Sequence, residues 1–147
     1  MPFNTTYANN ILSVIFGKTA SLPAPKKVYL ALSSNDPEAD GGSFTELSGG
    51  GYARVLISNL EESYPNLMGN ASGRAISNTA QINWNKATAA WKDIKGWALY
   101  DAPSGGNQIY YGKITNETGT VSVGAGAVAL FDPGTLRITL STTDEDV

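Results

Sequence analysis

The chain has 147 residues, a net charge of -3, and neither cysteine nor histidine. The length fits one domain with its own core. The missing residue types exclude disulfides, Cys-ligated metal sites and catalytic triads that use histidine. The acidic balance, with basic residues scattered along the chain, argues against a nucleic-acid partner. No apolar run reaches the length of about 18 residues that a membrane span requires, so we expect no membrane partner.

The first element along the chain is an amphipathic helix, expected over residues 4 to 16. Asn4 or Thr5 can cap its start, and Gly17 suits the left-handed residue that ends a helix. Its apolar residues recur at intervals of four: Tyr7, Ile11 and Ile15. A three-turn helix with one apolar face is marginal alone and must dock on something. We expect docking on its own domain, and the alternative is an arm that packs on a partner subunit.

A connector that contains Pro23 and Pro25 leads to the first predicted strands. Residues 26–33 alternate apolar and polar side chains, which is typical of a strand with one buried face. The segment YARVLIS after Gly51 predicts a second strand. Residues 60–77 have no clean period, so we expect a long loop or a ragged edge hairpin there.

The second half of the chain is more regular. Residues 80–85 predict a half-exposed strand, and residues 86–92 a turn or a single helical turn that carries Trp91. Residues 94–115 form the clearest predicted hairpin, because a Pro-Ser-Gly-Gly-Asn turn divides two apolar segments. A glycine-interrupted strand should bend at Gly124 or Gly126. After the turn at 132–134, the last predicted strand directs three side chains inward: Leu136, Ile138 and Leu140.

Seven or eight short strands and one helix predict an all-β fold. We expect an antiparallel two-sheet sandwich, of jelly-roll or Ig-like type, with a short N-terminal helix or arm. The expected division places the arm and connector at residues 1–25 and the β-sandwich domain at residues 26–141. Residues 142–147 form a short acidic tail.

Two loops could be taken for ligand sites. The segment Asp36 to Gly41 has the acidic spacing that opens a calcium loop, but position 12 of that loop would be Leu47. A solvated acidic turn is therefore the simpler interpretation, and a calcium site is the alternative. The glycines at 49–51 lack the lysine and the following helix of a phosphate-binding loop, so we expect a tight bend or a close backbone contact.

The carboxylates give no catalytic pair. Glu61 and Glu62 are adjacent, so on a strand their side chains point to opposite faces, and nothing in the sequence brings Asp93 and Asp101 together. We therefore expect no enzymatic activity, no catalytic residues, no metal ligands and no cofactor.

Aromatic residues are dense between positions 84 and 111: Trp84, Trp91, Trp97, Tyr100, Tyr110 and Tyr111. The alternating pattern places Trp97 and one of Tyr110 and Tyr111 in the core. The outward-facing tyrosines suit a protein–protein interface, where Tyr and Trp are enriched. The alternative is a platform on which sugar rings stack.

Two segments, SGGGYAR at 48–54 and the hairpin from Trp91 to Gly112, are the most specific parts of a longer pattern over residues 8–141. This pattern resembles a family of small structural proteins of tailed double-stranded-DNA bacteriophages, described as tail-fibre-like, tail or head decoration (cement) proteins. The resemblance implies an all-β virion component that has no enzymatic activity and works by repetition.

The small acidic domain without a fibre-shaft repeat favours a cement or decoration protein that stabilises the assembled head at the capsid surface. The alternative is a tail-associated or tail-fibre-like protein, including a receptor- or glycan-binding module. The expected partners are the major capsid protein or neighbouring virion subunits, and further copies of this chain in a dimer or trimer. The expected interface residues are Phe3, Tyr7, Ile11, Ile15, Phe16, Tyr52, Arg54, Tyr64, Trp91 and Tyr111.

Overall fold

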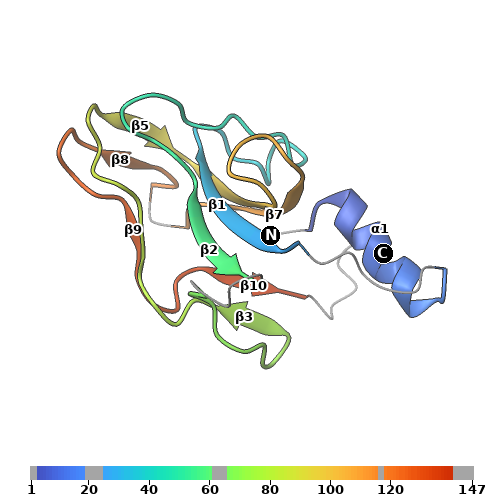
Figure 1. Ribbon diagram of the computed structural model, residues 1–147. Coiled ribbons are helices and arrows are strands. Elements are labelled where there is room, and N and C mark those ends of the chain that lie inside the picture. Colours follow the sequence, from blue (N-terminus) through green and yellow to red (C-terminus); the bar gives the residue numbers. More distant parts are fainter. Residues whose placement is uncertain (1–2, 19–24, 61–65, 116–117, 141–147) are drawn as a thin grey trace.

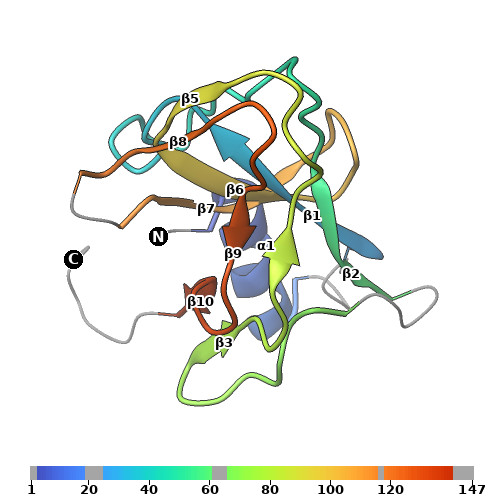
Figure 2. The same ribbon diagram turned by 90° about the vertical axis from the view of Figure 1, so that its left-hand side faces the viewer.

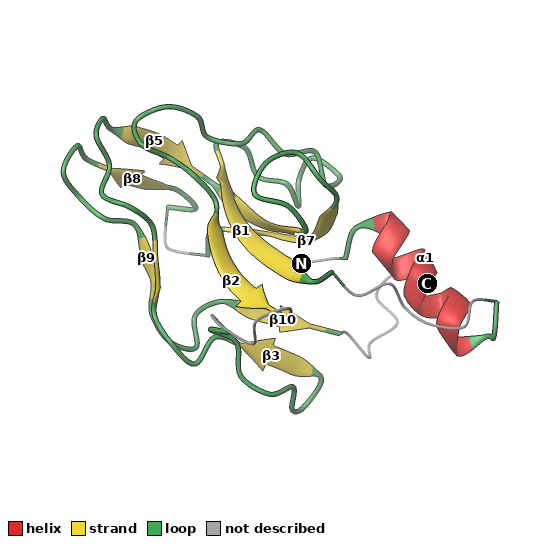
Figure 3. Cartoon of the chain, viewed as in Figure 1, coloured by secondary structure: helices red, strands yellow, loops and turns green. Residues whose placement is uncertain are grey.

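The computed structural model describes residues 3–18, 25–60, 66–115 and 118–140. In this part of the chain one helix precedes ten short strands, and Figure 3 shows the helix standing beside the body that the strands form. The elements are α1 (Thr5–Ile15), β1 (Lys27–Ser33), β2 (Val55–Asn59), β3 (Ala75–Ser77), β4 (Ile82–Asn83), β5 (Trp91–Ile94), β6 (Gly96–Tyr100), β7 (Gln108–Lys113), β8 (Val121–Val123), β9 (Leu130–Phe131) and β10 (Arg137–Thr139).

The first layer is a four-stranded antiparallel sheet in the order β2-β1-β6-β7. Its central strand β6 is buried on both faces, since Trp97, Ala98 and Leu99 all lie in the core region. Gly112 of β7 pairs with Trp97, and a Cβ at Gly112 would lie 2.5 Å from the indole ring. Glycine at this position therefore leaves the space into which Trp97 packs.

Three two-stranded ribbons, β10-β3, β4-β9 and β5-β8, form the second layer in place of one continuous sheet. The core cluster joins the two layers, because it combines Leu30 and Ile57 of the sheet with Ile82 and Ile138 of the ribbons. The fully buried Tyr110 of β7 also connects the layers, since its hydroxyl lies 3.4 Å from both the backbone nitrogen and the carbonyl oxygen of Thr139.

Buried Asn78 fixes the ends of the ribbons to one another. Its amide donates to the carbonyls of Ala80 and Asp132, at 2.8 and 3.0 Å. Its side-chain oxygen accepts the N–H of Leu136 at 3.0 Å. A buried amide with its hydrogen bonds satisfied in this way replaces the ladder bonds that such short strands cannot supply.

The structure confirms the predicted all-β, sandwich-like fold with one N-terminal helix. Asn4 caps α1 by accepting the N–H of Thr6, and Gly17 has a φ of 68°. The predicted hairpin within residues 94–115 corresponds to β6 and β7. The glycine bend is also present, since Gly126, with a φ of 84°, lies between β8 and β9.

Other sequence predictions were wrong in detail. Trp91 begins strand β5 and pairs with Val123 of β8, so it does not lie in a turn. Leu140 is 55 % exposed, because it lies beyond β10 and past the ladder to β3. The expectation of a long loop or a ragged edge hairpin over residues 60–77 agrees with the described part of that segment, since residues 66–77 contain isolated bridges and the short strand β3.

Candidate interaction surface

The N-terminal arm is anchored to β7 by its first described residues. Phe3 forms a β-bridge with Tyr110, and the two rings meet edge to face with centroids 4.8 Å apart. The N–H of Asn4 donates to the carbonyl of Ile109 at 2.8 Å, and the Asn4 side chain donates to Gln108 at 3.1 Å. The arm thus enters α1 directly from the edge of the sheet.

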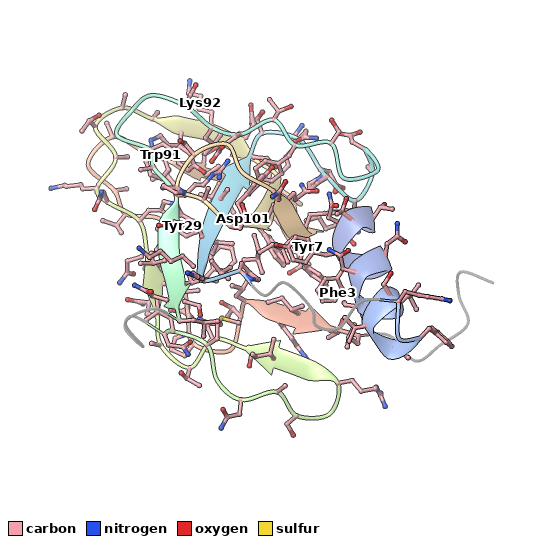
Figure 4. All side chains as sticks on the ribbon, turned by 45° about the vertical axis from the view of Figure 1, so that its right-hand side comes forward. Phe3, Tyr7, Tyr29, Trp91, Lys92 and Asp101 are labelled. Carbon is pink, nitrogen blue, oxygen red and sulfur yellow. The ribbon has the colours of Figure 1, made fainter. Side chains whose placement is uncertain are left out.

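Tyr7 is the next contact between the arm and the β body. Its side chain is half-buried and packs against the core cluster. Burial raises the pKa of Tyr7, and the nearby Asp101 carboxylate raises it further. Figure 4 shows Phe3 and Tyr7 at the junction between α1 and the strands. The first turn of α1 is therefore held, in part, by the domain's own core.

The C-terminal end of α1 is exposed, unlike the first turn, which packs against the core cluster. No residue of α1 is buried. Leu12 is 55 %, Ile15 67 % and Phe16 73 % exposed. The helix carries no acidic or basic residue along its sequence TTYANNILSVI. These three residues, called the α1 tip below, form an uncharged apolar surface on the outside of the molecule.

A second apolar surface lies on the ribbons. A groove of about 320 Å³ runs along β8 and β9 and the segment between them, with Leu32, Trp84 and Ile94 beneath. The groove lining contains no charged residue, and three large apolar residues of the lining are exposed: Val121, Val128 and Leu130. We call this surface the β8–β9 groove.

The two surfaces lie at opposite ends of the molecule. In Figure 1 α1 lies to the right of the β body, and β8 and β9 lie on its left. After the turn of 90° in Figure 2, β8 and β9 face the viewer and α1 lies behind the strands. The α1 tip therefore lies far from the groove of its own chain.

Tyr52 and Arg54, both expected at an interface, are engaged within the chain. Arg54 makes a two-pronged ion pair with Glu46, with both nitrogen–oxygen distances 2.8 Å. It also donates to the carbonyls of Ala102 and Gly105, and its guanidinium lies 3.9 Å from the centre of the Tyr100 ring. This geometry fixes the turn of the β6–β7 hairpin against the segment that leads into β2.

The Tyr52 hydroxyl completes this network. It donates to Glu46 at 2.8 Å and accepts the N–H of Leu32 at 3.0 Å. Burial raises the pKa of Tyr52, and the adjacent Glu46 carboxylate also raises it. The hydrogen bond with Glu46 raises the pKa of Arg54. The network joins three segments that are distant in sequence, which is a structural role.

The other expected interface residues have different positions. Trp91 is 4 % exposed, and its indole N–H donates to the Gly50 carbonyl at 2.9 Å, so its ring offers no face to a partner. Tyr111 is half-buried against Gly42, and burial raises its pKa. Ile11 is half-exposed on α1. Tyr64 lies outside the described residues.

The candidate ligand sites also have structural explanations. The three tryptophan rings of the sugar-platform hypothesis are 3–4 % exposed and belong to the core. In the acidic loop, Asp36 accepts the N–H groups of Glu38 and Ala39, and Asp40 accepts from Asn35. Within the described ranges, no three carboxylates gather as a metal site would require.

Backbone geometry explains the glycine-rich segment as well. Gly50 has a φ of 60°, and its carbonyl accepts both the Trp91 indole and the N–H of Thr88. The expected tight bend with a close backbone contact is therefore present.

The described part of the chain contains no helix long and apolar enough to cross a bilayer.

Sequence reasoning missed several residues of the two apolar surfaces. Leu12 lies within the predicted helix but outside the spacing of Tyr7, Ile11 and Ile15, and its exposure depends on how α1 is anchored. Val128 and Leu130 read as strand residues, and their positions at the groove depend on the pairing of β4 with β9. Pairing between distant segments carries no local sequence signal.

A search of the curated proteins found none that matches the chain, whereas a comparison with known protein families found a match. Residues 2–139 match the family described as podophage GP4 fiber I protein gp80. The match covers the arm, the four-stranded sheet and all three ribbons. It agrees with the resemblance to structural proteins of tailed phages that residues 48–54 and the β6–β7 hairpin carry. The chain therefore belongs to the podophage GP4 fiber I protein gp80 family, and it is a structural protein of a phage virion.

Proposed function

We propose that this protein is a subunit of a fibre or another tail-associated structure of a podophage virion. The observation that carries the proposal is the match of residues 2–139 to a family described as a fiber protein. The sequence alone favoured a cement protein of the head over the tail-associated alternative. The family description supports the alternative, so we place the chain in the tail rather than on the capsid surface.

The proposed mode of action is assembly, with no enzymatic step. The absence of histidine and cysteine removes the side chains that most catalytic centres use. The polar network around Arg54 is occupied by contacts that hold the fold. The apolar surfaces at both ends of the molecule are instead suited to contacts with neighbouring virion subunits.

The copy number of the chain in purified virions tests this proposal. Tail structures follow the low-order rotational symmetry of the tail, so a tail protein should be present in on the order of ten to a few tens of copies. A cement protein repeats over the icosahedral shell and should be present in on the order of hundreds. Quantitative mass spectrometry against the major capsid protein gives the number, and gold-labelled antibody gives the location. Labelling over the head, with hundreds of copies, would overturn the proposal.

A further inference from the structure

We propose that the α1 tip of one copy docks in the β8–β9 groove of a second copy of this chain. This inference names the partner surface of the assembly described above, and it rests on the proposed function for the premise that the chain works in several copies. The contact is head to tail, because the tip and the groove are different surfaces of the same molecule.

The distribution of exposed apolar side chains points to these two surfaces. Eight large apolar residues of the described part are exposed: Leu12, Ile15, Phe16, Leu60, Val121, Val128, Leu130 and Leu140. Three of them form the α1 tip and three lie at the groove. Concentrated exposed apolar surface marks interaction sites, whereas single apolar residues at a surface are ordinary. Among the described residues, the tip and the groove are thus the two places where large exposed apolar side chains occur in groups.

The sizes of the tip and the groove agree. The groove measures about 320 Å³. An apolar cavity of about 150 Å³ is enough to bind a benzene molecule. The groove therefore has room for the Phe16 ring together with a second side chain of similar size, such as Ile15. These two residues are the most exposed of the large apolar residues, at 73 % and 67 %.

The charges agree as well. Neither α1 nor the groove lining contains an Asp, Glu, Lys or Arg residue, so the two surfaces themselves bring no formal charge into the contact. The cavity beside the groove differs, because Lys113 and Asp132 line it. The acidic segment TTDED near the end of the chain is a poor occupant for an uncharged apolar groove, since its carboxylates would lose water without a partner.

The arrangement in space excludes docking within one chain. Phe3 and Asn4 fix the start of α1 to β7, and Figures 1 and 2 show β8 and β9, whose residues line the groove, on the opposite side of the β body. The tip can reach such a groove only on another molecule. A contact between two different surfaces repeats from copy to copy, and it gives a closed ring if the rotation closes or an open chain if it does not.

Cross-linking in the cysteine-free chain tests which surfaces meet. Leu12→Cys and Val128→Cys are made as separate variants, one of them carrying a mass tag, and are mixed with a short bismaleimide linker. We expect a cross-linked product that contains one copy of each variant. Leu60→Cys, at an exposed apolar residue outside both surfaces, replaces either partner as the control and should give no product. A product of two Leu12→Cys copies, or none between tip and groove, would overturn the proposal.

A second experiment measures self-association after substitutions in the tip or in the groove. Light scattering of the unmodified chain should show an oligomer larger than the 15.5 kDa monomer. The double variant Ile15→Ser/Phe16→Ser and the groove variant Val128→Asp should each weaken self-association by about tenfold or more, whereas Leu60→Asp should not. A monomer at all concentrations would show that the tip and the groove do not bind each other and would overturn the proposal. The virion copy number is measured separately. The assignment to the tail can therefore fail while the tip–groove contact is confirmed, and the tip–groove contact can fail while the assignment to the tail is confirmed.

Discussion

The centre of the four-stranded sheet and the end of α1 use apolar residues in opposite ways. In β6, Trp97 is 4 % exposed, stacks on the Tyr110 ring 5.9 Å away and fills the space above Gly112. In the arm, Phe16 is 73 % exposed and no residue of α1 is buried. The sheet centre and the α1 tip both contain large apolar side chains, but those of the tip remain outside the core.

This difference separates the residues that fold the chain from those available to a partner. Apolar burial is the main favourable contribution to folding, and it is roughly proportional to the area removed from water. The α1 tip removes little area within its own chain, so its apolar character contributes little to the stability of the domain. The same side chains can contribute fully when a neighbouring molecule covers them.

The largest expected effect is at the sheet centre. Trp97→Ala removes a buried indole from a packed site and should lower the free energy of unfolding by about 3–5 kcal/mol. Chemical denaturation followed by circular dichroism measures the change. A loss below about 1 kcal/mol would show that the site collapses around the missing ring, and that the sheet centre is less essential than its burial indicates.

Arg54 should come next, because it joins separate segments of the β body. Arg54→Ala removes the ion pair to Glu46 and the bonds to two loop carbonyls, and should cost about 2–3 kcal/mol. Arg54→Lys retains the charge but not the planar fork, so it should recover only part of the loss. If lysine restored full stability, charge rather than geometry would be the contribution of this residue.

Tyr52 should have a smaller effect that depends on pH. Tyr52→Phe removes the hydroxyl bonds to Glu46 and Leu32 and should cost about 1–2 kcal/mol at neutral pH. Burial raises the pKa of Tyr52 above its ordinary value of 10.0, so the folded chain keeps a proton that the unfolded chain loses. The stability that the protonated Tyr52 hydroxyl contributes is complete below about pH 10, and it declines as the pH rises above that value.

The contribution of the Tyr52 hydroxyl to stability can therefore be measured at alkaline pH, by comparing the unmodified protein with the Tyr52→Phe variant. The unmodified protein should lose stability more steeply than Tyr52→Phe above about pH 10, and the two should run parallel below it. Denaturation midpoints taken between pH 7 and pH 11 give both curves. Equal slopes in the alkaline range would mean that the Tyr52 hydroxyl titrates alike in the folded and unfolded chains.

The smallest effect on folding should be at the α1 tip. Phe16→Ala truncates an aromatic residue, as Trp97→Ala does, but should change the free energy of unfolding of the monomer by no more than about 0.5 kcal/mol. Denaturation at high dilution measures the monomer alone, since oligomers add concentration-dependent stability. A loss comparable to that of Trp97→Ala would place Phe16 in the core and remove the distinction between the two regions.

Local patterns in the sequence predicted the elements that depend on neighbouring residues. Asn4 and Gly17 marked the ends of α1, and the turn at 103–107 identified the β6–β7 hairpin. Alternation failed in β6, where Ala98 is as buried as Trp97, because this strand is central and covered on both faces. The periodicity of a strand indicates burial only when one face meets water.

The two apolar surfaces could be predicted only in part. The apolar character of α1 was visible at Tyr7, Ile11 and Ile15, but the sequence favoured docking on its own domain. In the described part of the chain, Phe3, Asn4 and Tyr7 make the contacts that anchor the arm, and the tip is exposed. The groove combines residues between positions 32 and 131, so it exists only after the long-range pairing of the ribbons.

The most direct test of this separation compares one double variant in two measurements. Ile15→Ser/Phe16→Ser is examined by light scattering at high concentration and by denaturation at high dilution. We predict that self-association is weakened by about tenfold or more while the free energy of unfolding of the monomer stays within about 0.5 kcal/mol of the unmodified chain. A parallel loss of stability, or self-association as strong as that of the unmodified chain, would contradict the assignment of the α1 tip to assembly.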